Sequence, residues 1–196
     1  GVILMTLVIG YLSARPVLRW YYDATEMKDN TLTQKSIDVM KKLDGPLTIT
    51  TYINMLDEDY FRGMPRYYNE DFERFEKFVR FKPEMKIKYV SYYDKVQNSS
   101  LDRRYPGLSD EERLAKICEV EEWDVKDILT PEEIHKIEDL SGEYNKFARV
   151  IERGNGQKSI LRIYDDNMRH PSETEITAAF KRMVVKSPMV AFLEGH

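Results

Sequence analysis

The sequence is poor in cysteine, with Cys118 as the single thiol among 196 residues. One thiol excludes a disulfide within the chain and also a cysteine-rich zinc site. Cys118 follows Leu114 and Ile117 at helical spacing. We therefore expect a small buried core residue here rather than a reactive thiol.

The sequence also lacks a long block of charge of one sign. It has 30 Lys and Arg residues against 34 Asp and Glu residues, so its net charge is -4. Such a balance gives no field that would attract nucleic acid, and we expect no nucleic-acid partner. The hydrophobic share of 42% and the charged share of 33% are typical of a folded globular domain.

Motifs for phosphate binding and nucleophilic catalysis are absent from the sequence. Gly154-Asn155-Gly156 is interpreted as a hairpin turn, because no helix follows it to complete a phosphate-binding loop. There is no Walker A pattern, so we do not expect the chain itself to hydrolyse ATP. Nothing resembles Gly-x-Ser-x-Gly. The sequence therefore predicts no enzyme activity and no cofactor.

One histidine lies at a spacing that metal sites use. Glu132 and His135 are three residues apart on a predicted helix, with Asp139 one turn further on. A zinc site needs three or four protein ligands, so an ordinary charged helix face is the favoured interpretation.

Two other polar groups receive ordinary structural interpretations. His170 precedes Pro171, where a capping or turn role is favoured. Asp165 and Asp166 end a predicted strand, which favours a turn over a pair of acid–base carboxylates. No catalytic or metal-binding residue is assigned.

Tyrosine occurs in three pairs, at positions 21–22, 67–68 and 92–93. We expect one member of each pair to face the core and the other to lie at its rim. The alternative is a platform of exposed tyrosines that binds a sugar or a peptide.

The amino-terminal segment 2–12 is apolar and carries no charge. Its eleven residues are too few to cross a bilayer, which takes about 20. We interpret it as the end of a transmembrane helix, with Tyr11 and Trp20 in an interfacial aromatic belt. The alternative is a buried helix or strand of a soluble domain. Arg15 and Arg19 oppose an extracytoplasmic orientation, because positive charge tends to remain on the cytoplasmic side.

Hydrophobic periodicity predicts five helices and five strands. The helices are expected at residues 31–43, 67–81, 109–120, 130–140 and 171–184. The strands are expected at residues 47–54, 85–93, 146–153, 158–165 and 189–193. Residues 97–107 are predicted to form a loop. The buried stripe of helix 67–81 is expected to comprise Tyr68, Phe72, Phe75 and Val79.

From residue 47 onward the order is strand, helix, strand, helical insert, strand, strand, helix. This is the order of a thioredoxin-like domain in the α/β (α+β) class, although the Cys-x-x-Cys motif needed for redox chemistry is absent. We divide the chain into a membrane-proximal segment (1–22), the thioredoxin-like domain (23–186) and the first strand of a second, truncated α/β domain (187–196).

The predicted final strand runs into Glu194, Gly195 and His196. Polar groups at the carboxyl end of a sheet strand lie where α/β folds bind ligands. These three residues are therefore candidate ligand or interdomain contacts. A plain strand-to-loop turn is the alternative.

Three stretches together resemble one family. Residues 23–36 contain Asp-Ala-Thr-Glu and Asn-Thr-Leu-Thr, and they resemble an opening that follows a membrane helix. Residues 172–179 (SETEITAA) resemble a helix motif of the same family, and residues 190–196 (VAFLEGH) resemble its strand motif. The family is the gliding-motility-type auxiliary component of ABC transporters. Ala24 departs from its pattern, which has leucine there.

The resemblance implies a non-catalytic domain on the extracytoplasmic side of a bacterial inner membrane. Its implied partners are the permease and ATPase subunits of an ABC transporter and, through the amino-terminal segment, the membrane. The resemblance also implies that the last strand begins a glutamine-amidotransferase-like domain that usually lacks a catalytic triad. The alternative is part of an enzyme, or of a sugar- or peptide-binding module, whose site is completed downstream.

Overall fold

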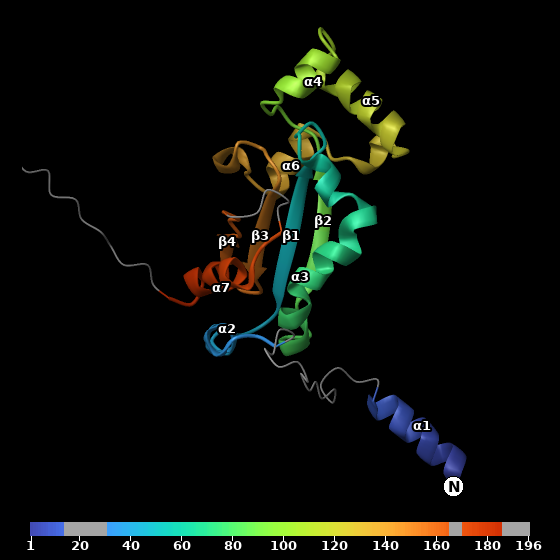
Figure 1. The fold of residues 1–196 in the computed structure, drawn as a ribbon, viewed down its shortest axis with the longest axis vertical. Coiled ribbons are helices and arrows are strands. Elements are labelled where there is room, and N and C mark those ends of the chain that lie inside the picture. Colours follow the sequence, from blue (N-terminus) through green and yellow to red (C-terminus); the bar gives the residue numbers. More distant parts are fainter. Residues whose placement is uncertain (14–30, 165–169, 186–196) are drawn as a thin grey trace, which may run out of the picture.

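A computed structural model describes residues 1–13, 31–164 and 170–185 of the chain. The fold is of the α/β class, with a four-stranded mixed sheet in the order β2-β1-β3-β4. The strands are β1 (Leu47–Asn54), β2 (Lys86–Tyr92), β3 (Ala148–Arg153) and β4 (Lys158–Ile160). β2 pairs with β1 in parallel, and β3 is antiparallel to both β1 and β4 (Figure 1).

Seven helices are present in the described part of the chain. They are α1 (Val2–Ser13), α2 (Gln34–Met40), α3 (Tyr68–Phe81), α4 (Ser99–Arg104), α5 (Asp110–Glu121), α6 (Pro131–Ile137) and α7 (Glu173–Arg182). Short 3-10 turns lie at Tyr60–Gly63, Pro65–Tyr67, Val125–Asp127 and Ser141–Glu143. In Figure 1, α2 and α7 lie at one end of β1, and α4 and α5 lie at the other.

Local sequence signals fix where most helices begin. Capping boxes open α5, α6 and α7, at Ser109, Thr130 and Ser172 respectively. In each box the hydroxyl accepts a bond from a backbone N–H three residues on, and a glutamate returns the bond, so two free helix donors are satisfied. The helices predicted at residues 31–43 and 130–140 are shorter than expected, and end at Met40 and Ile137.

One predicted loop is wrong. Residues 97–107 include the helix α4, which begins after Asn98. The Asn98 side chain accepts a hydrogen bond from the Leu101 N–H at 3.0 Å and so caps the helix. Polar composition favoured a loop here because six residues are too few to show hydrophobic periodicity.

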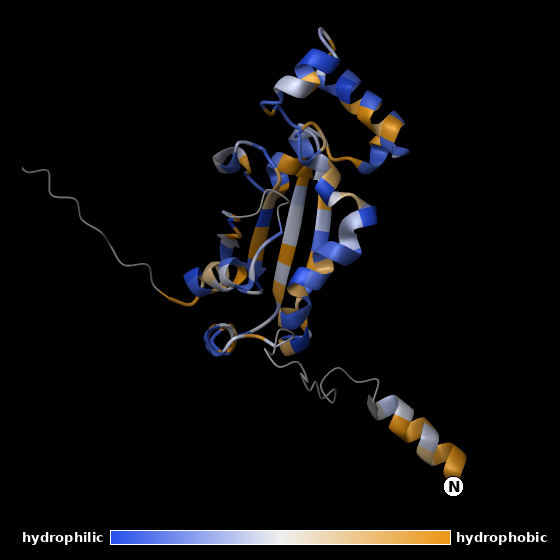
Figure 2. Cartoon of the chain, viewed as in Figure 1, coloured by the Kyte–Doolittle hydropathy of each residue, from blue (hydrophilic) through white to orange (hydrophobic). Residues whose placement is uncertain are grey.

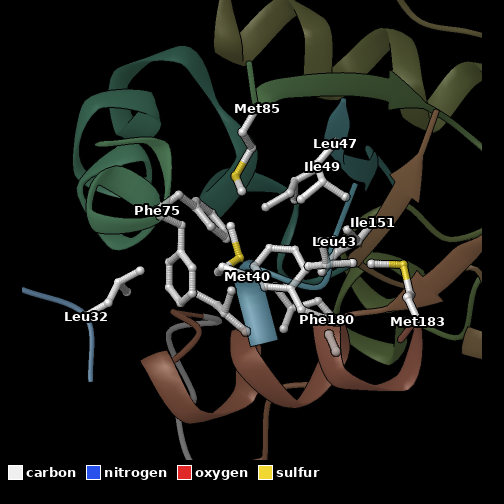
Figure 3. Packing of buried hydrophobic residues seen from close by; sticks show 14 residues of the cluster. Leu32, Met40, Leu43, Leu47, Ile49, Phe75, Met85, Ile151, Phe180 and Met183 are labelled. Carbon is white, nitrogen blue, oxygen red and sulfur yellow. The ribbon is translucent and has the colours of Figure 1, made fainter. Parts of the chain in front are cut away.

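A cluster of buried apolar residues, which we name the apolar cluster, fills the amino end of the sheet between β1, α2, α3 and α7. Figure 3 shows Met40, Phe75 and Phe180 pointing into the same space from three different helices. α7 packs against this space with Ile176, Ala179 and Phe180, which are fully buried. The buried members of the apolar cluster are Leu32, Met40, Leu43, Leu47, Ile49, Phe75, Phe78, Met85, Ile151, Leu161, Ile176, Ala179, Phe180 and Met183.

The predicted stripe of α3 is confirmed at Phe75, which is fully buried, but it is wrong at Phe72. Phe72 is 40% exposed, whereas Phe78 and the charged Asp71 are buried. Asp71 is turned inward because Arg149 of β3 pairs with it through two bonds of 2.6 and 2.8 Å. Hydrophobic periodicity excludes a carboxylate from the buried face, and so it could not place Asp71 there.

The amino-terminal apolar segment is helical and forms α1. The large apolar residues of α1 that Figure 2 shows in orange are exposed in this structure. Within the described residues, no helix has both the length and the apolar character needed to cross a membrane. Trp20 and the predicted strand at 189–193 lie outside the described residues.

Candidate functional site

The carboxyl ends of the parallel strands β1 and β2 meet at one edge of the sheet. This is the edge at which open α/β sheets bind ligands. Asn54 ends β1 and is fully buried. Its side-chain amide donates to the carbonyls of Asp94 at 2.9 Å and Asn145 at 2.8 Å, and its oxygen accepts from the Leu56 N–H at 3.0 Å. Asn54 thus ties together three segments that are far apart in the sequence.

Asp94 lies just beyond β2, and its carboxylate accepts hydrogen bonds from several donors. Its Oδ1 accepts from the Lys95 N–H at 2.7 Å, and its Oδ2 accepts from the side-chain amide of Asn145 at 3.0 Å. The Nε2 atom of His135, on α6, lies 2.6 Å from the same Oδ2. We name Asn54, Tyr92, Asp94, His135 and Asn145 the carboxyl-edge cluster.

The carboxyl-edge cluster holds an unusual backbone turn. Tyr144 and Asn145 both have left-handed backbones, with φ of +58° and +53°. A non-glycine residue in this region costs on the order of 1 kcal/mol and persists where surrounding contacts fix it. The Asn145 carbonyl accepts from the Tyr92 hydroxyl at 3.0 Å as well as from Asn54. Burial raises the pKa of Tyr92, which keeps its hydroxyl protonated as a donor.

The turn leaves Tyr144 81% exposed beside a cleft of 730 Å³, which we name the larger cleft. This volume lies within the range of small-molecule and peptide pockets. Arg113 is paired with Asp102 at 2.8 Å on one wall. The charged residues of the larger cleft are Lys95, Asp102, Asp110, Arg113 and Lys146, with Ser141 and Asn145 also in its wall.

The sequence-predicted histidines have specific partners. His135 lies on a helix face as expected and its side chain is 60% exposed, but it contacts Asp94 rather than Asp139. Asp139 lies beyond the end of α6 and accepts from Ser141. Among the described residues there is no group of three His, Cys, Asp or Glu side chains suited to a metal ion.

His170 does not cap α7, so capping, one of the two roles predicted for it, is wrong. Ser172 is the N-cap, and the His170 ring instead lies 3.4 Å from Arg74 and 3.6 Å from Glu70, both on α3. The thiol of Cys118 is buried, as expected, and burial raises its pKa. Asp165, Asp166, Glu194, Gly195 and His196 lie outside the described residues.

The two tyrosine pairs that the structure describes do not divide between core and rim as expected, and the pair at 21–22 lies outside the described residues. Tyr92 and Tyr93 are both buried, and Tyr67 and Tyr68 are both half-buried. Tyr68 stacks on Tyr89 with ring centroids 3.7 Å apart. The exposed Tyr144 belongs to none of the pairs. Its left-handed backbone has no signature in the sequence, so spacing could not identify it.

Two of the stretches that carry the family resemblance meet in space. Glu173 Oε1 accepts from the Ser36 hydroxyl at 2.6 Å and from the Thr33 N–H at 2.8 Å. The Ser36 hydroxyl also lies 2.8 Å from that of Thr177. These bonds join α2 to α7 beside the apolar cluster. In these two stretches Thr33, Ser36, Glu173 and Thr177 therefore stabilise the contact between α2 and α7.

No protein-family model, curated protein or solved structure matches the chain.

Proposed function

We propose that the chain is a non-catalytic interaction domain on the extracytoplasmic side of a bacterial ABC-type transport system. It binds a partner protein through the larger cleft, with Tyr144 as the anchor. The observation that carries this proposal is that the carboxyl-edge cluster fixes the backbone turn at Tyr144 and Asn145. Asn54, Asp94 and Asn145 hydrogen-bond to backbone groups and to one another, and the result is a fixed turn that presents an aromatic side chain. A rigid exposed tyrosine beside a charged cleft is typical of a protein-binding surface.

The transport assignment rests on the family resemblance. The contact of Ser36 with Glu173 and Thr177 supports it, because two stretches of the resemblance that are far apart in sequence form one structural unit. In this proposal the permease or ATPase subunits are the partners, and the protein lies at the inner membrane.

A thioredoxin-like fold without redox chemistry is part of the same proposal. A parallel β-α-β unit, β1-α3-β2, is followed by an antiparallel hairpin and a helix, β3-β4-α7. The order β2-β1-β3-β4 supports this assignment. The larger cleft then lies at the sheet edge where such α/β units bind their ligands.

Photocrosslinking in living cells tests the partner. A benzophenone amino acid at position 144 is expected to crosslink to the membrane permease of the transporter, identified by mass spectrometry. Position 164 provides the matched control, because Tyr164 is also strongly exposed but does not line the larger cleft. Equal crosslinking from both positions, or crosslinks to unrelated soluble proteins alone, would contradict the proposal.

The membrane contact of α1 is tested separately. Leu4, Leu7 and Val8 are exposed apolar residues of α1. The protein is expected to sediment with vesicles of phosphatidylethanolamine and phosphatidylglycerol, and the triple change to asparagine is expected to release it. Sedimentation that is unchanged by the substitutions would remove α1 from the proposed membrane contact.

An acid–base site is the second candidate function. The observation that favours it is the 2.6 Å contact between His135 and Asp94, since a carboxylate that orients an imidazole is a common feature of general bases. The downstream residues Glu194 and His196 would then complete the site. An activity that disappears in His135→Gln, with the fold unchanged by circular dichroism, would establish this candidate over the binding domain.

A further inference from the structure

Charge is divided unevenly between the two ends of the sheet. Residues 97–143, which include α4, α5 and α6, hold 14 Asp and Glu residues against 6 Lys and Arg residues. The amino end of the sheet comprises residues 35–48, 82–86, 152–159 and 181–182, and we name it the basic end. It holds 9 Lys and Arg residues against 4 Asp and Glu residues. The fold therefore separates positive from negative charge along the strands (Figure 1).

Hydrogen bonds hold the segments of the basic end together. The Lys82 ammonium, at the end of α3, donates to the Leu43 carbonyl at 2.9 Å. The Arg153 guanidinium, at the end of β3, donates to the carbonyls of Asp44 at 3.4 Å and Met183 at 3.2 Å. The ends of α2, α3, β3 and α7 therefore lie next to one another and form one surface.

Five lysines of the basic end are exposed and make no ion pair within the described part of the chain. They are Lys35, Lys41, Lys42, Lys86 and Lys181. Lys35 and Lys181 line the same groove of 480 Å³ between α2 and α7. Two nearby carboxylates have other partners, since Glu84 pairs with Lys82 at 2.7 Å and Asp38 accepts from the Gln34 amide at 2.8 Å. The positive charge of these lysines is therefore not neutralised by an ion pair.

Helix ends account for only some of these lysines. Lys41 and Lys42 follow α2, and Lys181 lies in the last turn of α7, where a cation offsets the helix dipole. Lys35 lies in the first turn of α2, where the dipole disfavours a cation, and Lys86 lies on a strand. The lysines are therefore a feature of the whole surface rather than of single helices.

The chain that follows α1 joins the domain at this same end. Thr31 is the first described residue after α1, and it precedes Leu32, which is buried in the apolar cluster. The residues between Ser13 and Thr31 span at most about 60 Å when fully extended. A membrane that holds α1 therefore keeps the basic end close to its surface.

We propose that the basic end docks on the anionic phospholipid headgroups of the membrane that α1 contacts, an inference that rests on the membrane contact proposed above. The exposed lysines of the basic end pair with the headgroup phosphates. Attachment through α1 raises the effective concentration, so individually weak pairs suffice. The acidic residues 97–143 are repelled and point away from the lipid. The larger cleft, which includes Asp102 and Asp110 of that segment, then faces a part of the partner that lies outside the bilayer.

Vesicle sedimentation of the full chain tests the docking. Vesicles of phosphatidylcholine alone are compared with vesicles that also contain phosphatidylglycerol. The protein is expected to bind the anionic vesicles about tenfold more tightly or better, and high salt should abolish this preference. Lys41→Glu/Lys42→Glu/Lys181→Glu should remove most of it. Because α1 is uncharged, it binds both kinds of vesicle alike, so a lack of binding to both tests α1 and not the basic end.

A matched control separates the basic end from net charge. Lys116→Glu/Lys126→Glu/Lys136→Glu reverses three exposed lysines within the acidic segment and should leave the preference for phosphatidylglycerol unchanged. All six positions are exposed, so both triple variants should unfold near the wild-type temperature. Equal losses in the two variants overturn the proposal, as does a preference that survives in the basic-end variant. So does a wild-type protein that binds both vesicles equally or is insensitive to salt, a result that needs no variant.

Discussion

At the amino end of β1 the sheet packs into the apolar cluster, whereas at the carboxyl end it runs into buried polar groups centred on Asn54. The carboxylate beside the apolar cluster, Glu173, is surrounded by hydroxyl and N–H donors. The carboxylate near the other end, Asp57, is left with one unsatisfied oxygen. Apolar burial stabilises in any direction, while a polar network fixes one geometry and is costly where it is incomplete. The two ends therefore differ in how completely their polar groups are satisfied, although the carboxyl end also buries apolar residues, among them Ile53 and Leu114.

The largest expected effect is at the ion pair of Arg149 and Asp71, which are 2% and 4% exposed. Arg149→Met leaves the Asp71 carboxylate buried without its cation, and should lower the free energy of unfolding by about 3–5 kcal/mol. Urea denaturation measures this loss. The double variant Arg149→Met/Asp71→Leu should recover most of it, because a well-packed apolar pair replaces the charges. A double variant as unstable as the single one would show that geometry, rather than an isolated charge, causes the loss.

Two phenylalanines of α3 compare the apolar cluster with the helix surface. Phe78 is buried and meets Phe180 edge to face, with ring centroids 5.5 Å apart. Phe78→Ala should therefore cost about 3–5 kcal/mol through lost packing and a cavity. Phe72→Ala changes an exposed residue of the same helix and should cost a small fraction of that in the same urea titration. Comparable losses would return Phe72 to the buried face of α3, as the sequence predicted.

Glu173 should give the protein an acid-sensitive contribution to stability. Partial burial opposes its ionisation, but the bonds from Ser36 and Thr33 outweigh burial and lower its pKa below the ordinary 4.5. This contribution is complete above the unfolded-state pKa and is lost as the pH falls through the folded-state pKa. Glu173→Gln should cost about 1–2 kcal/mol at pH 7 and little at low pH. Thermal denaturation from pH 7 to pH 3 measures the difference, which disappears if the contact is absent in solution.

Asp57 should show the opposite dependence on pH. Burial raises its pKa, so the folded state holds the carboxylate at a cost above that pKa, and the cost is relieved as the pH falls through it. Asp57→Asn should raise the free energy of unfolding at pH 7 by about 1 kcal/mol, because the unsatisfied charge is removed. The same denaturation series measures it. A loss of stability in Asp57→Asn would show that the charge of Asp57, with its bond from the Phe147 N–H, stabilises the fold more than its burial costs.

Local signals were sufficient for much of the fold. The bounds of β1 and the three capping boxes follow from residues within a few positions of each other. The hairpin of β3 and β4 follows from the glycine-rich turn, although β4 ends at Ile160, earlier than predicted. Each of these features depends on backbone preferences and periodicity, which a short window of sequence contains.

The candidate site could not be predicted in the same way, because its contacts are distant in sequence. Asn54 meets residues 40 and 91 positions away, and Asp94 meets His135 41 positions away. The predicted stripe of helix 67–81 does not include Asp71, because periodicity selects apolar residues alone and the partner of Asp71, Arg149, is 78 residues distant. Periodicity describes the preference of each residue alone and contains no information about such pairs.

The hydrogen bonds between α2 and α7 also determine when the domain can complete its folding during synthesis. Ser36 meets Glu173 and Thr177 across 137 and 141 residues. At about 5–20 residues per second, a ribosome needs roughly 7 to 28 seconds to synthesise that interval. Until α7 emerges, Met40 and Leu43 lack the contact with Phe180 that they have in the finished apolar cluster. Between the synthesis of α2 and that of α7 this apolar surface is therefore incomplete, and the cluster closes only after translation has passed residue 180.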